Sequence, residues 1–204
     1  EYYGFKPIET PIMEQVEVFT TAIGAGTDVI DKEMYTLKTK GGDHLALRPE
    51  HTAGTIRAYL EHGMQSLPQP VLMYHSGPVF RHENPQKGRY RQFTGFDLDV
   101  YGSEKSIIDA LVMRTAYTIL QESGASNLSI DINSIGDRDC RPKYIRELTN
   151  YFKKHSKDLP AVDRERLANN PLRILDSKDP KTIALCADAP AMTDYLCSDC
   201  KKHF

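Results

Sequence analysis

Alternation of apolar and polar residues predicts two antiparallel hairpins in the first half of the chain. Residues 34–38 (MYTLK) and 44–48 (HLALR) flank KGGD, a turn signal that predicts a first hairpin. Longer extended segments at 71–83 and 89–101 flank the polar turn NPQKG and predict a second hairpin.

The second arm of the longer hairpin separates an apolar face from a polar one, because residues two apart on a strand share a face. Phe96, Leu98 and Val100 share the face that we expect to meet the core. The opposite face carries Phe93, Gly95, Asp97 and Asp99. One side of this hairpin is therefore predicted to be a polar platform.

Helical periodicity follows both hairpins. The segment TAGTIRAYLEHG predicts a helix with the Thr52 hydroxyl at its start and Gly63 after its end. A longer helix is predicted at about 104–123, and LSIDI at 128–132 predicts a further strand. Beyond NSIGD the pattern becomes a helical stripe made of Tyr144, Ile145, Leu148 and Phe152.

These elements predict an α+β fold in two parts. An antiparallel sheet flanked by helices is expected over residues 1–136, and a mainly helical segment over 137–204. With 204 residues and 40% hydrophobic content, the chain is long enough for one sizeable core and a second small domain. The N-terminal residues EYYGFKPIET lack a secretory pattern and no run matches a membrane span, so we expect a cytoplasmic protein. Both ends look like cuts, so the chain is interpreted as a fragment.

The four cysteines do not suggest a disulfide framework, because they are unevenly spread in a chain without a secretory signal. Cys197 and Cys200 form a CxxC, with Cys186 upstream and His203 downstream, a set that could hold a structural zinc. Reduced thiols at a helix end are the alternative. We expect no stoichiometric metal, because only one of the usual two ligand pairs has standard spacing.

The stretch FRHENPQKGRYRQF concentrates positive charge in a chain whose formal net charge is only -2. It contains a single acid, Glu83, and four cations: Arg81, Lys87, Arg89 and Arg91. Guanidinium groups match phosphate and carboxylate oxygens, whereas an acid and an aromatic suit the amine and the ring of a base. The stretch therefore indicates a nucleoside triphosphate, with a merely solvated hairpin as the alternative. The sequence contains no P-loop, no GxGxxG, no GxSxG and no HExxH.

Several blocks resemble bacterial histidyl-tRNA synthetases in order and spacing. They are GFKPIETPIMEQVEVF, TDVIDKEMYTLKTKGGDHLALRPEHTAGTIRA, GPVFRHENPQKGRYRQF and LRILDSKDP. The first resembles class II motif 1, which ends at a proline, here Pro11, and builds a homodimer interface; the block around Arg81 resembles motif 2. The resemblance implies that L-histidine is activated with ATP and Mg²⁺ to histidyl-adenylate and then transferred to tRNA(His).

The resemblance also assigns the residues of an ATP site. Arg81 matches the catalytic arginine that bridges the α-phosphate and the amino-acid carboxylate. Glu83 matches the acceptor for the adenine amine, Arg89 the contact to the pyrophosphate end, and Phe93 the ring that stacks on adenine.

Histidine and tRNA contacts are implied in the same way. Glu50 and Thr52 would bind the substrate's α-amino group, and the histidine site would also include positions 95 and 99. The hairpin tip, with Asn84, Gln86 and Lys87, would meet the acceptor end of tRNA. Residues from 137 on resemble the start of the helical insertion domain.

The sequence departs from the family pattern in three ways: at Gly95, at His51 and in the family segments that it lacks. Gly95 stands where a glutamine is usual, Asp99 is the acid at the fourth position beyond it, and His51 stands where a glycine is common. Motif 3, the histidine-specific arginine and the anticodon-binding domain are not in these residues. We therefore expect the isolated chain to bind ATP weakly and to be inactive.

Two other functions are weighed against the ligase. A non-catalytic paralogue resembling the regulatory subunit of ATP phosphoribosyltransferase would bind histidine without needing Arg81, Glu83 and Arg89 together. A plain nucleic-acid-binding domain would have a basic balance, whereas the pI here is about 6.4.

Overall fold

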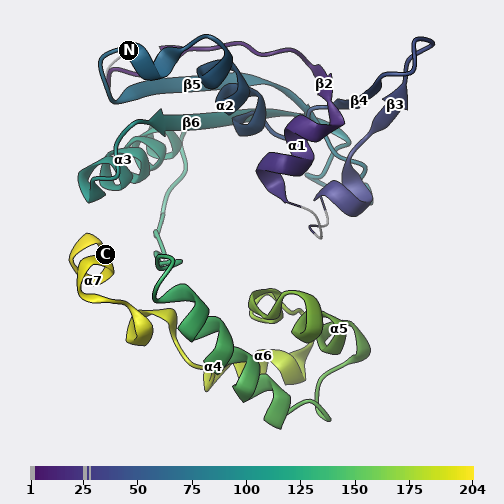
Figure 1. Cartoon of the computed structure of the whole chain (residues 1–204), viewed down its shortest axis with the longest axis vertical. Helices are drawn as coiled ribbons and strands as arrows, with labels where there is room; N and C mark the ends of the chain where they lie inside the picture. Colours follow the sequence, from purple (N-terminus) through teal and green to yellow (C-terminus); the bar gives the residue numbers. More distant parts are fainter. Residues whose placement is uncertain (1–2, 25–26, 28) are drawn as a thin grey trace. The chain divides into compact units, whose positions relative to one another are not determined.

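A computed structural model of the chain describes residues 3–24, 27 and 29–204. The chain forms two compact units, Glu1–Ser123 and Gly124–Phe204 (Figure 1). Every strand of the described residues lies in the first unit, and the second unit is helical. The α+β class predicted from the sequence is confirmed. The break between the units falls at Gly124, whereas the sequence places a boundary near Asp137.

The main sheet of the first unit holds the longer hairpin. Its order is β1-β5-β6, from the strands β1 (Lys6–Pro7), β5 (Val71–Phe80) and β6 (Gln92–Tyr101). β5 and β6 pair antiparallel along their whole lengths, from Val71 opposite Tyr101 to Phe80 opposite Gln92, as the alternation predicts. β1 adds one short parallel pairing at the other edge of β5.

A second, smaller sheet carries the first predicted hairpin. Its order is β2-β4-β3, from β2 (Met13–Gln15), β4 (His44–Leu47) and β3 (Thr36–Lys38), all antiparallel. The helices of this unit are α1 (Val16–Ile23), the π-helix η1 (Val29–Glu33), α2 (Thr52–Glu61), the 3-10 helix η2 (Met64–Ser66) and α3 (Ser106–Glu122). Phe19, Ala46 and Ala53 form a small buried core from α1, β4 and α2.

The polar face of the β5–β6 hairpin is the more buried one, so the predicted core face is wrong. Asp99 is 8% exposed, whereas Phe96 on the opposite face is 47% exposed. The reason is the position of α2: Tyr59 stacks on Tyr101, with ring centroids 4.8 Å apart, and covers the polar side.

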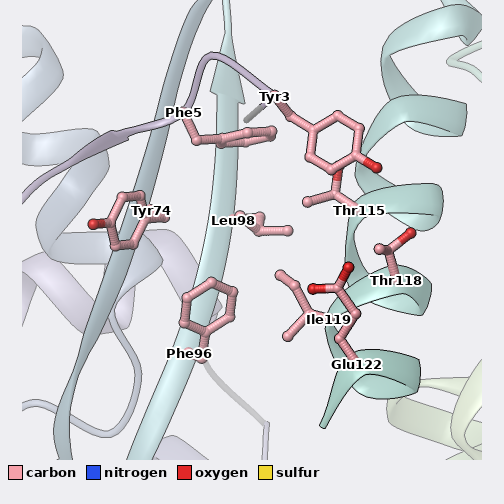
Figure 2. Close-up of a pocket in the computed structure, with 9 residues that line it drawn as sticks. All are labelled: Tyr3, Phe5, Tyr74, Phe96, Leu98, Thr115, Thr118, Ile119 and Glu122. Carbon is pink, nitrogen blue, oxygen red and sulfur yellow. The ribbon is translucent and has the colours of Figure 1, made fainter. Parts of the chain in front are cut away.

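The apolar face turns toward α3 and is only partly filled. A cavity of about 600 Å³ lies between the hairpin and that helix (Figure 2). It is lined by Tyr3, Phe5, Tyr74, Phe96, Leu98, Thr115, Thr118, Ile119 and Glu122. None of the residues assigned to ATP or histidine lines this cavity, so the candidate site belongs to the other face.

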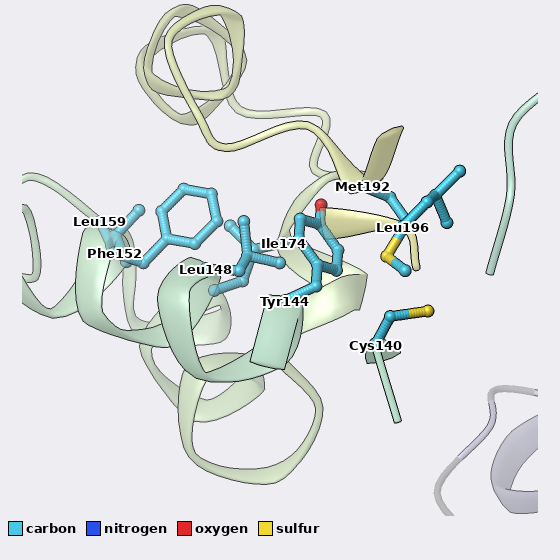
Figure 3. Close-up of a cluster of buried hydrophobic side chains, with 8 residues drawn as sticks. All are labelled: Cys140, Tyr144, Leu148, Phe152, Leu159, Ile174, Met192 and Leu196. Atoms are coloured by element: carbon cyan, nitrogen blue, oxygen red, sulfur yellow. The ribbon is translucent and has the colours of Figure 1, made fainter. Parts of the chain in front are cut away.

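The second unit packs its helices around one apolar cluster. Its elements are α4 (Arg141–Lys154), α5 (Ala161–Asn169), η3 (Pro171–Ile174), α6 (Pro180–Ala187), η4 (Met192–Tyr195) and α7 (Ser198–His203). Tyr144, Leu148 and Phe152 recur every four residues on α4 and are buried, as the helical stripe predicts. The full cluster consists of Cys140, Tyr144, Leu148, Phe152, Leu159, Ile174, Met192 and Leu196 (Figure 3).

The strand predicted at 128–132 is wrong. These residues have no regular structure, and Ile130 and Ile132 are both about half exposed. Without a neighbouring strand to complete its backbone hydrogen bonds, an alternating sequence does not form a sheet. Among the described residues, no helix is both long and apolar enough to cross a membrane.

Candidate active site

Arg81 is held at the end of β5 by two kinds of contact. Its backbone N–H donates to the Arg91 carbonyl at 3.0 Å, which extends the hairpin ladder past the strands. Its side-chain Nε donates to the Pro49 carbonyl at 2.9 Å, and its Cζ lies 5.5 Å from the ring centroid of Phe93. The structure thus brings Arg81 and Phe93 together, and places both beside the segment that leads into α2.

That segment is anchored by Arg48, which is buried. Its Nε donates to the Pro78 carbonyl at 2.8 Å and its Nη1 to the Thr10 carbonyl at 2.7 Å. Burial lowers the pKa of Arg48, although Glu9 opposes the shift. A Cβ at Gly77 would lie 2.9 Å from Nη2 of Arg48, so the close approach requires glycine there. Arg48 therefore fixes the loop before α2 against β5.

Glu50 provides the cap of α2, a role that the sequence analysis gave to the Thr52 hydroxyl. Its two carboxylate oxygens accept from the backbone N–H groups of Thr52 at 2.7 Å and Ala53 at 2.8 Å. A carboxylate satisfies the free N–H groups of a helix start and is also favoured by the helix dipole. Glu50 and Thr52 are therefore rigidly placed, and unused lone pairs of the carboxylate remain available to a ligand.

Two histidines that the sequence analysis did not assign to the site lie at the start of α2 and on the neighbouring strand β5. His51 and His75 are both buried, and their rings stack with centroids 3.9 Å apart and an angle of 8° between planes. Nδ1 of His51 lies 2.5 Å from a carboxylate oxygen of Asp97. Burial lowers the pKa of His75 to about 4, and the nearby His51 and Arg48 lower it in the same direction. His75 is therefore neutral at pH 7.

Two of the departures from the family pattern touch each other. A Cβ at Gly95 would lie 3.0 Å from Cε1 of His51 and 3.4 Å from Cγ2 of Val79. Only a glycine leaves room for the His51 ring in this position without a shift of its neighbours. A histidine at 51 and a glycine at 95 are thus explained by one contact.

Asp99 adds a buried acid deeper along the same face. Burial raises the pKa of its carboxyl, and the negative charges of Asp97 and Glu50 raise it further, whereas the nearby Thr52 side chain opposes the shift. Burial and the charge of Asp99 also raise the pKa of Tyr101.

Unpartnered polar atoms gather on this face. In the described part of the chain, Nε2 of His51 and both ring nitrogens of His75 are buried without a hydrogen-bond partner. Oδ2 of Asp99 and the hydroxyl of Tyr101 are also buried; they interact with each other but do not form a hydrogen bond of good geometry. Buried polar groups are normally paired, so such a concentration indicates a surface prepared for a polar ligand.

The hairpin tip beyond Arg81 is exposed to solvent. Arg89 and Glu83 form an ion pair with an Nη1 to Oε2 distance of 3.2 Å. Backbone hydrogen bonds between Gln86 and Arg89 close the turn, in which Gly88 has a φ of 82°. The side chains of Asn84, Gln86 and Lys87 are all exposed. The tip is therefore accessible to a large partner.

The cysteine set predicted as a possible zinc site is wrong in composition. The group that the structure brings together consists of Asp137, Cys140, Cys197 and Cys200, without Cys186 or His203. Sequence reasoning overlooked that Asp137-x-x-Cys140 has the same spacing as the CxxC motif.

Similarity to known proteins agrees with this arrangement. Residues 35–185 match the family model described as the tRNA synthetase class II core domain (G, H, P, S and T). The chain belongs to this class II synthetase family. A histidine–tRNA ligase of Desulforamulus reducens is 45% identical over 202 residues, which are 99% of this chain and 48% of that protein. One of Dictyoglomus turgidum is 47% identical over 204 residues, 100% of this chain and 50% of that protein.

Solved structures of class II synthetases give the same result. The apo histidyl-tRNA synthetase of S. aureus matches with a TM-score of 0.72 at 33% identity, over 100% of this chain and 45% of that one. A Bacillus halodurans C protein described as an ATP phosphoribosyltransferase regulatory subunit/histidyl-tRNA synthetase shares the fold, with a TM-score of 0.59 at 19% identity. The present chain spans about half the length of the curated relatives that it matches.

Proposed function

We propose that these residues form the ATP-binding and histidine-binding part of a histidine–tRNA ligase. The observation that carries the proposal is the position of Arg81, which donates to the carbonyl of Pro49, the residue before the α2 cap Glu50, and lies over the ring of Phe93. A guanidinium beside a base-stacking ring and a carboxylate can contact nucleotide and amino acid at once. The identity to histidine–tRNA ligases supports the choice of amino acid.

In this proposal, Arg81 orients the reacting groups. An oxygen of the histidine carboxylate attacks the α-phosphorus of ATP, and the bond from that phosphorus to the bridging oxygen of pyrophosphate breaks as pyrophosphate leaves. Arg81 would bind the α-phosphate oxygens and stabilise their charge as it develops. Mg²⁺ would enter with the nucleotide as MgATP, held by phosphate oxygens.

The rest of the nucleotide would be held by the hairpin. Phe93 would stack on adenine, Glu83 would accept from the adenine amine, and Arg89 would bind the pyrophosphate end. This requires the Glu83–Arg89 ion pair to open. Because Arg89 is mostly exposed, such a pair contributes only about 0–1 kcal/mol, which a polyphosphate would replace readily.

Histidine would bind with its ammonium group near three carboxylates. Glu50, Asp97 and Asp99 lie close enough for Asp97 and Glu50 to raise the pKa of Asp99, so a cation among them relieves repulsion. Thr52 and Gly95 would complete the site, with the unpartnered Nε2 of His51 as a polar contact.

Further partners follow from the same proposal. The exposed tip with Asn84, Gln86 and Lys87 would contact the acceptor end of tRNA(His), and residues 137–204 would begin the insertion domain. The segment around Pro11 would belong to a homodimer interface; the neighbouring Ile12 and Met13 are apolar and exposed, which supports this role. The protein would act in the cytoplasm.

The alternative is a histidine-binding regulatory subunit without ligase activity. The likeness to the Bacillus halodurans C protein concerns the fold alone. Arg81, Phe93, Glu83 and Arg89 together favour the ligase, because a regulator has no need of phosphate and adenine contacts.

The test separates ATP chemistry from tRNA contact, in a protein of the relatives' full length that contains these residues. Arg81→Lys keeps the charge but removes the planar fork, so histidine-dependent ATP–pyrophosphate exchange should fall by ~10²-fold or more while histidine binding changes little. Gln86→Ala on the same hairpin is the matched variant. It should impair aminoacylation and leave exchange largely intact.

Exchange within threefold of wild type for Arg81→Lys would contradict the role of Arg81. A wild-type protein that binds histidine without exchange would support the regulatory alternative. If Gln86→Ala lowered exchange and aminoacylation equally, the tip would be serving ATP.

A further inference from the structure

A cluster of three thiols and one carboxylate lies in the second unit, outside the candidate active site. The ligand atoms of Asp137, Cys140, Cys197 and Cys200 all lie within 4.8 Å of one another. They come from two short segments: Asp137 and Cys140 directly precede α4, whereas Cys197 precedes α7 and Cys200 lies in it. The two segments are about sixty residues apart in sequence, so the fold itself creates the cluster.

The distances are near those that a tetrahedral ion would impose. Sγ of Cys140 and Sγ of Cys200 are 3.7 Å apart, and Sγ of Cys197 is 3.2 Å from Oδ2 of Asp137. Zinc binds thiolate at about 2.3 Å and carboxylate oxygen at about 2.0–2.2 Å, so tetrahedral ligand atoms are separated by roughly 3.5–3.8 Å. The cluster therefore needs only small adjustments to close around one ion.

The carboxylate is oriented for one-oxygen coordination. Oδ1 of Asp137 accepts from the backbone N–H groups of Asp139 at 2.9 Å and Cys140 at 2.8 Å. Oδ2 is left facing the thiols. Hydrogen bonds of this kind fix a ligand in place before the metal arrives.

Backbone N–H groups also point at two of the sulfurs. The N–H of Asp137 donates to Sγ of Cys140 at 3.2 Å, and the N–H of Cys200 donates to Sγ of Cys197 at 3.4 Å. Each pair with x-x spacing thus contains one backbone donor to a sulfur, from the first residue to the second in Asp137–Cys140 and from the second to the first in Cys197–Cys200. Such donors stabilise a sulfur that carries negative charge.

Gly136 is required for this geometry. Its φ is +65°, and a Cβ there would lie 2.8 Å from Sγ of Cys140 and 2.2 Å from Cε of Met192. Basic residues directly follow three of the four ligands: Arg138, Arg141 and Lys201. Their charge would moderate that of three thiolates and a carboxylate around a divalent ion.

We propose that Asp137, Cys140, Cys197 and Cys200 bind one structural Zn²⁺ ion. Two ligand pairs with x-x spacing and three thiolates resemble the four-cysteine set of structural zinc sites, with a carboxylate, which zinc also binds, in place of the fourth thiolate. Four protein ligands leave no position for substrate. The site is independent of the proposed ligase activity. It replaces the expectation of no metal, because the structure supplies the second ligand pair.

The first experiment measures metal in the 204-residue chain, purified with reductant and without a chelating resin. Mass spectrometry should find about one zinc per chain. Cys197→Ser and Cys200→Ser should lose it. Cys186→Ser is the matched control, because Cys186 packs against the same core with its Sγ on the Ile174 carbonyl at 3.6 Å, outside the cluster, and it should keep the metal.

Substitutions of Asp137 are expected either to weaken or to strengthen zinc binding. Asp137→Asn should weaken zinc binding in competition with a chelator, whereas Asp137→Cys should retain about one zinc per chain and bind it more tightly. Cobalt substitution gives a readout independent of the purified metal content: the wild type and Cys186→Ser should show the absorption bands of tetrahedral cobalt thiolate. These bands also report on the wild type alone if a ligand variant fails to fold.

Three results would overturn the proposal. One is a folded wild-type chain that takes up neither zinc nor cobalt. Another is an equal loss of metal from Cys186→Ser and Cys197→Ser. The third is a Cys140–Cys200 disulfide in place of the metal in protein kept under reductant.

Discussion

The two units contain contrasting groups of buried polar side chains. In the second unit, the carboxylate of Asp163 is 1% exposed and fully engaged. It accepts from Ser177 Oγ at 2.5 Å, Thr182 Oγ1 at 2.9 Å and Arg166 Nη1 at 2.9 Å. In the first unit, by contrast, buried atoms of His51, His75, Asp99 and Tyr101 lack a hydrogen bond of good geometry.

The difference separates structural from functional polarity. A closed network such as that of Asp163 joins α5, the loop after η3 and α6, and it rigidifies them because every member has its partner. Buried polar atoms without partners lower the stability of the ligand-free protein, and a bound ligand could supply the missing hydrogen bonds. Burial without a hydrogen-bond partner is therefore a stronger indication of a ligand site than burial alone.

The largest effect is expected where the closed network is broken. Asp163→Ala leaves Ser177 and Thr182 without their acceptor and Arg166 without its ion pair, so the second unit should lose on the order of 3 kcal/mol. Urea dependence of hydrogen exchange in α4 to α6 would measure it. Asp158→Ala, at an exposed acid of the same unit, should stay within about 0.5 kcal/mol. Equal effects of the two changes would remove the contrast between the units.

A smaller effect is expected at the contact between His51 and Gly95. Gly95→Gln forces side-chain atoms into the His51 ring and should destabilise the first unit by about 2 kcal/mol. His51→Gly should relieve the clash. The double variant should therefore be more stable, by more than about 1 kcal/mol, than the sum of the two single effects predicts. Unfolding of the four proteins by urea gives the coupling. Additive effects would mean that the two departures are unrelated.

The smallest effect is a pH dependence from His75, whose pKa is about 4 in the folded protein against an ordinary 6.5. Between these values the unfolded chain takes up a proton and the folded one does not. Stability is therefore complete above 6.5 and falls as the pH falls toward 4. From pH 7 to about 5.5 the loss should be about 1 kcal/mol.

The control for this pH dependence is another histidine. His75→Phe should abolish the difference in unfolding free energy between the two pH values. His62→Phe, at an exposed position, should retain it. If the unfolding free energy of the wild type changed no more between these pH values than that of His75→Phe, His75 would not be the source of the pH dependence.

Local pattern predicts the scaffold of the site well. The antiparallel pairing of β5 with β6 follows from the two extended segments and the turn between them, and the placement of Phe93, Gly95, Asp97 and Asp99 on one face follows from alternation. Which face is buried does not follow, because that depends on where α2 packs. Phe96 illustrates this: an apolar residue remains half exposed while Asp99 opposite it is covered.

Of the remaining errors, two have a long-range cause and one, the cap of α2, is local. His51 and Gly95 read as separate departures until tertiary structure puts them in contact. The sequence suggested the Thr52 hydroxyl as the cap of α2. In the structure the Glu50 carboxylate caps the helix instead, by accepting from two backbone N–H groups. The pairing of Asp137 with Cys197 spans sixty residues, a separation at which sequence spacing carries no signal.

That same pairing gives the helical region an unusual topology. Asp137, before its first helix, and Cys197, before its last, lie side by side, so the chain leaves and returns at nearly one point. A stretch whose ends meet can be added to a loop of a host protein, exchanged or deleted with little disturbance to the host backbone. The residues between these ends have the geometry of such an insertion, and the cluster joins its two ends.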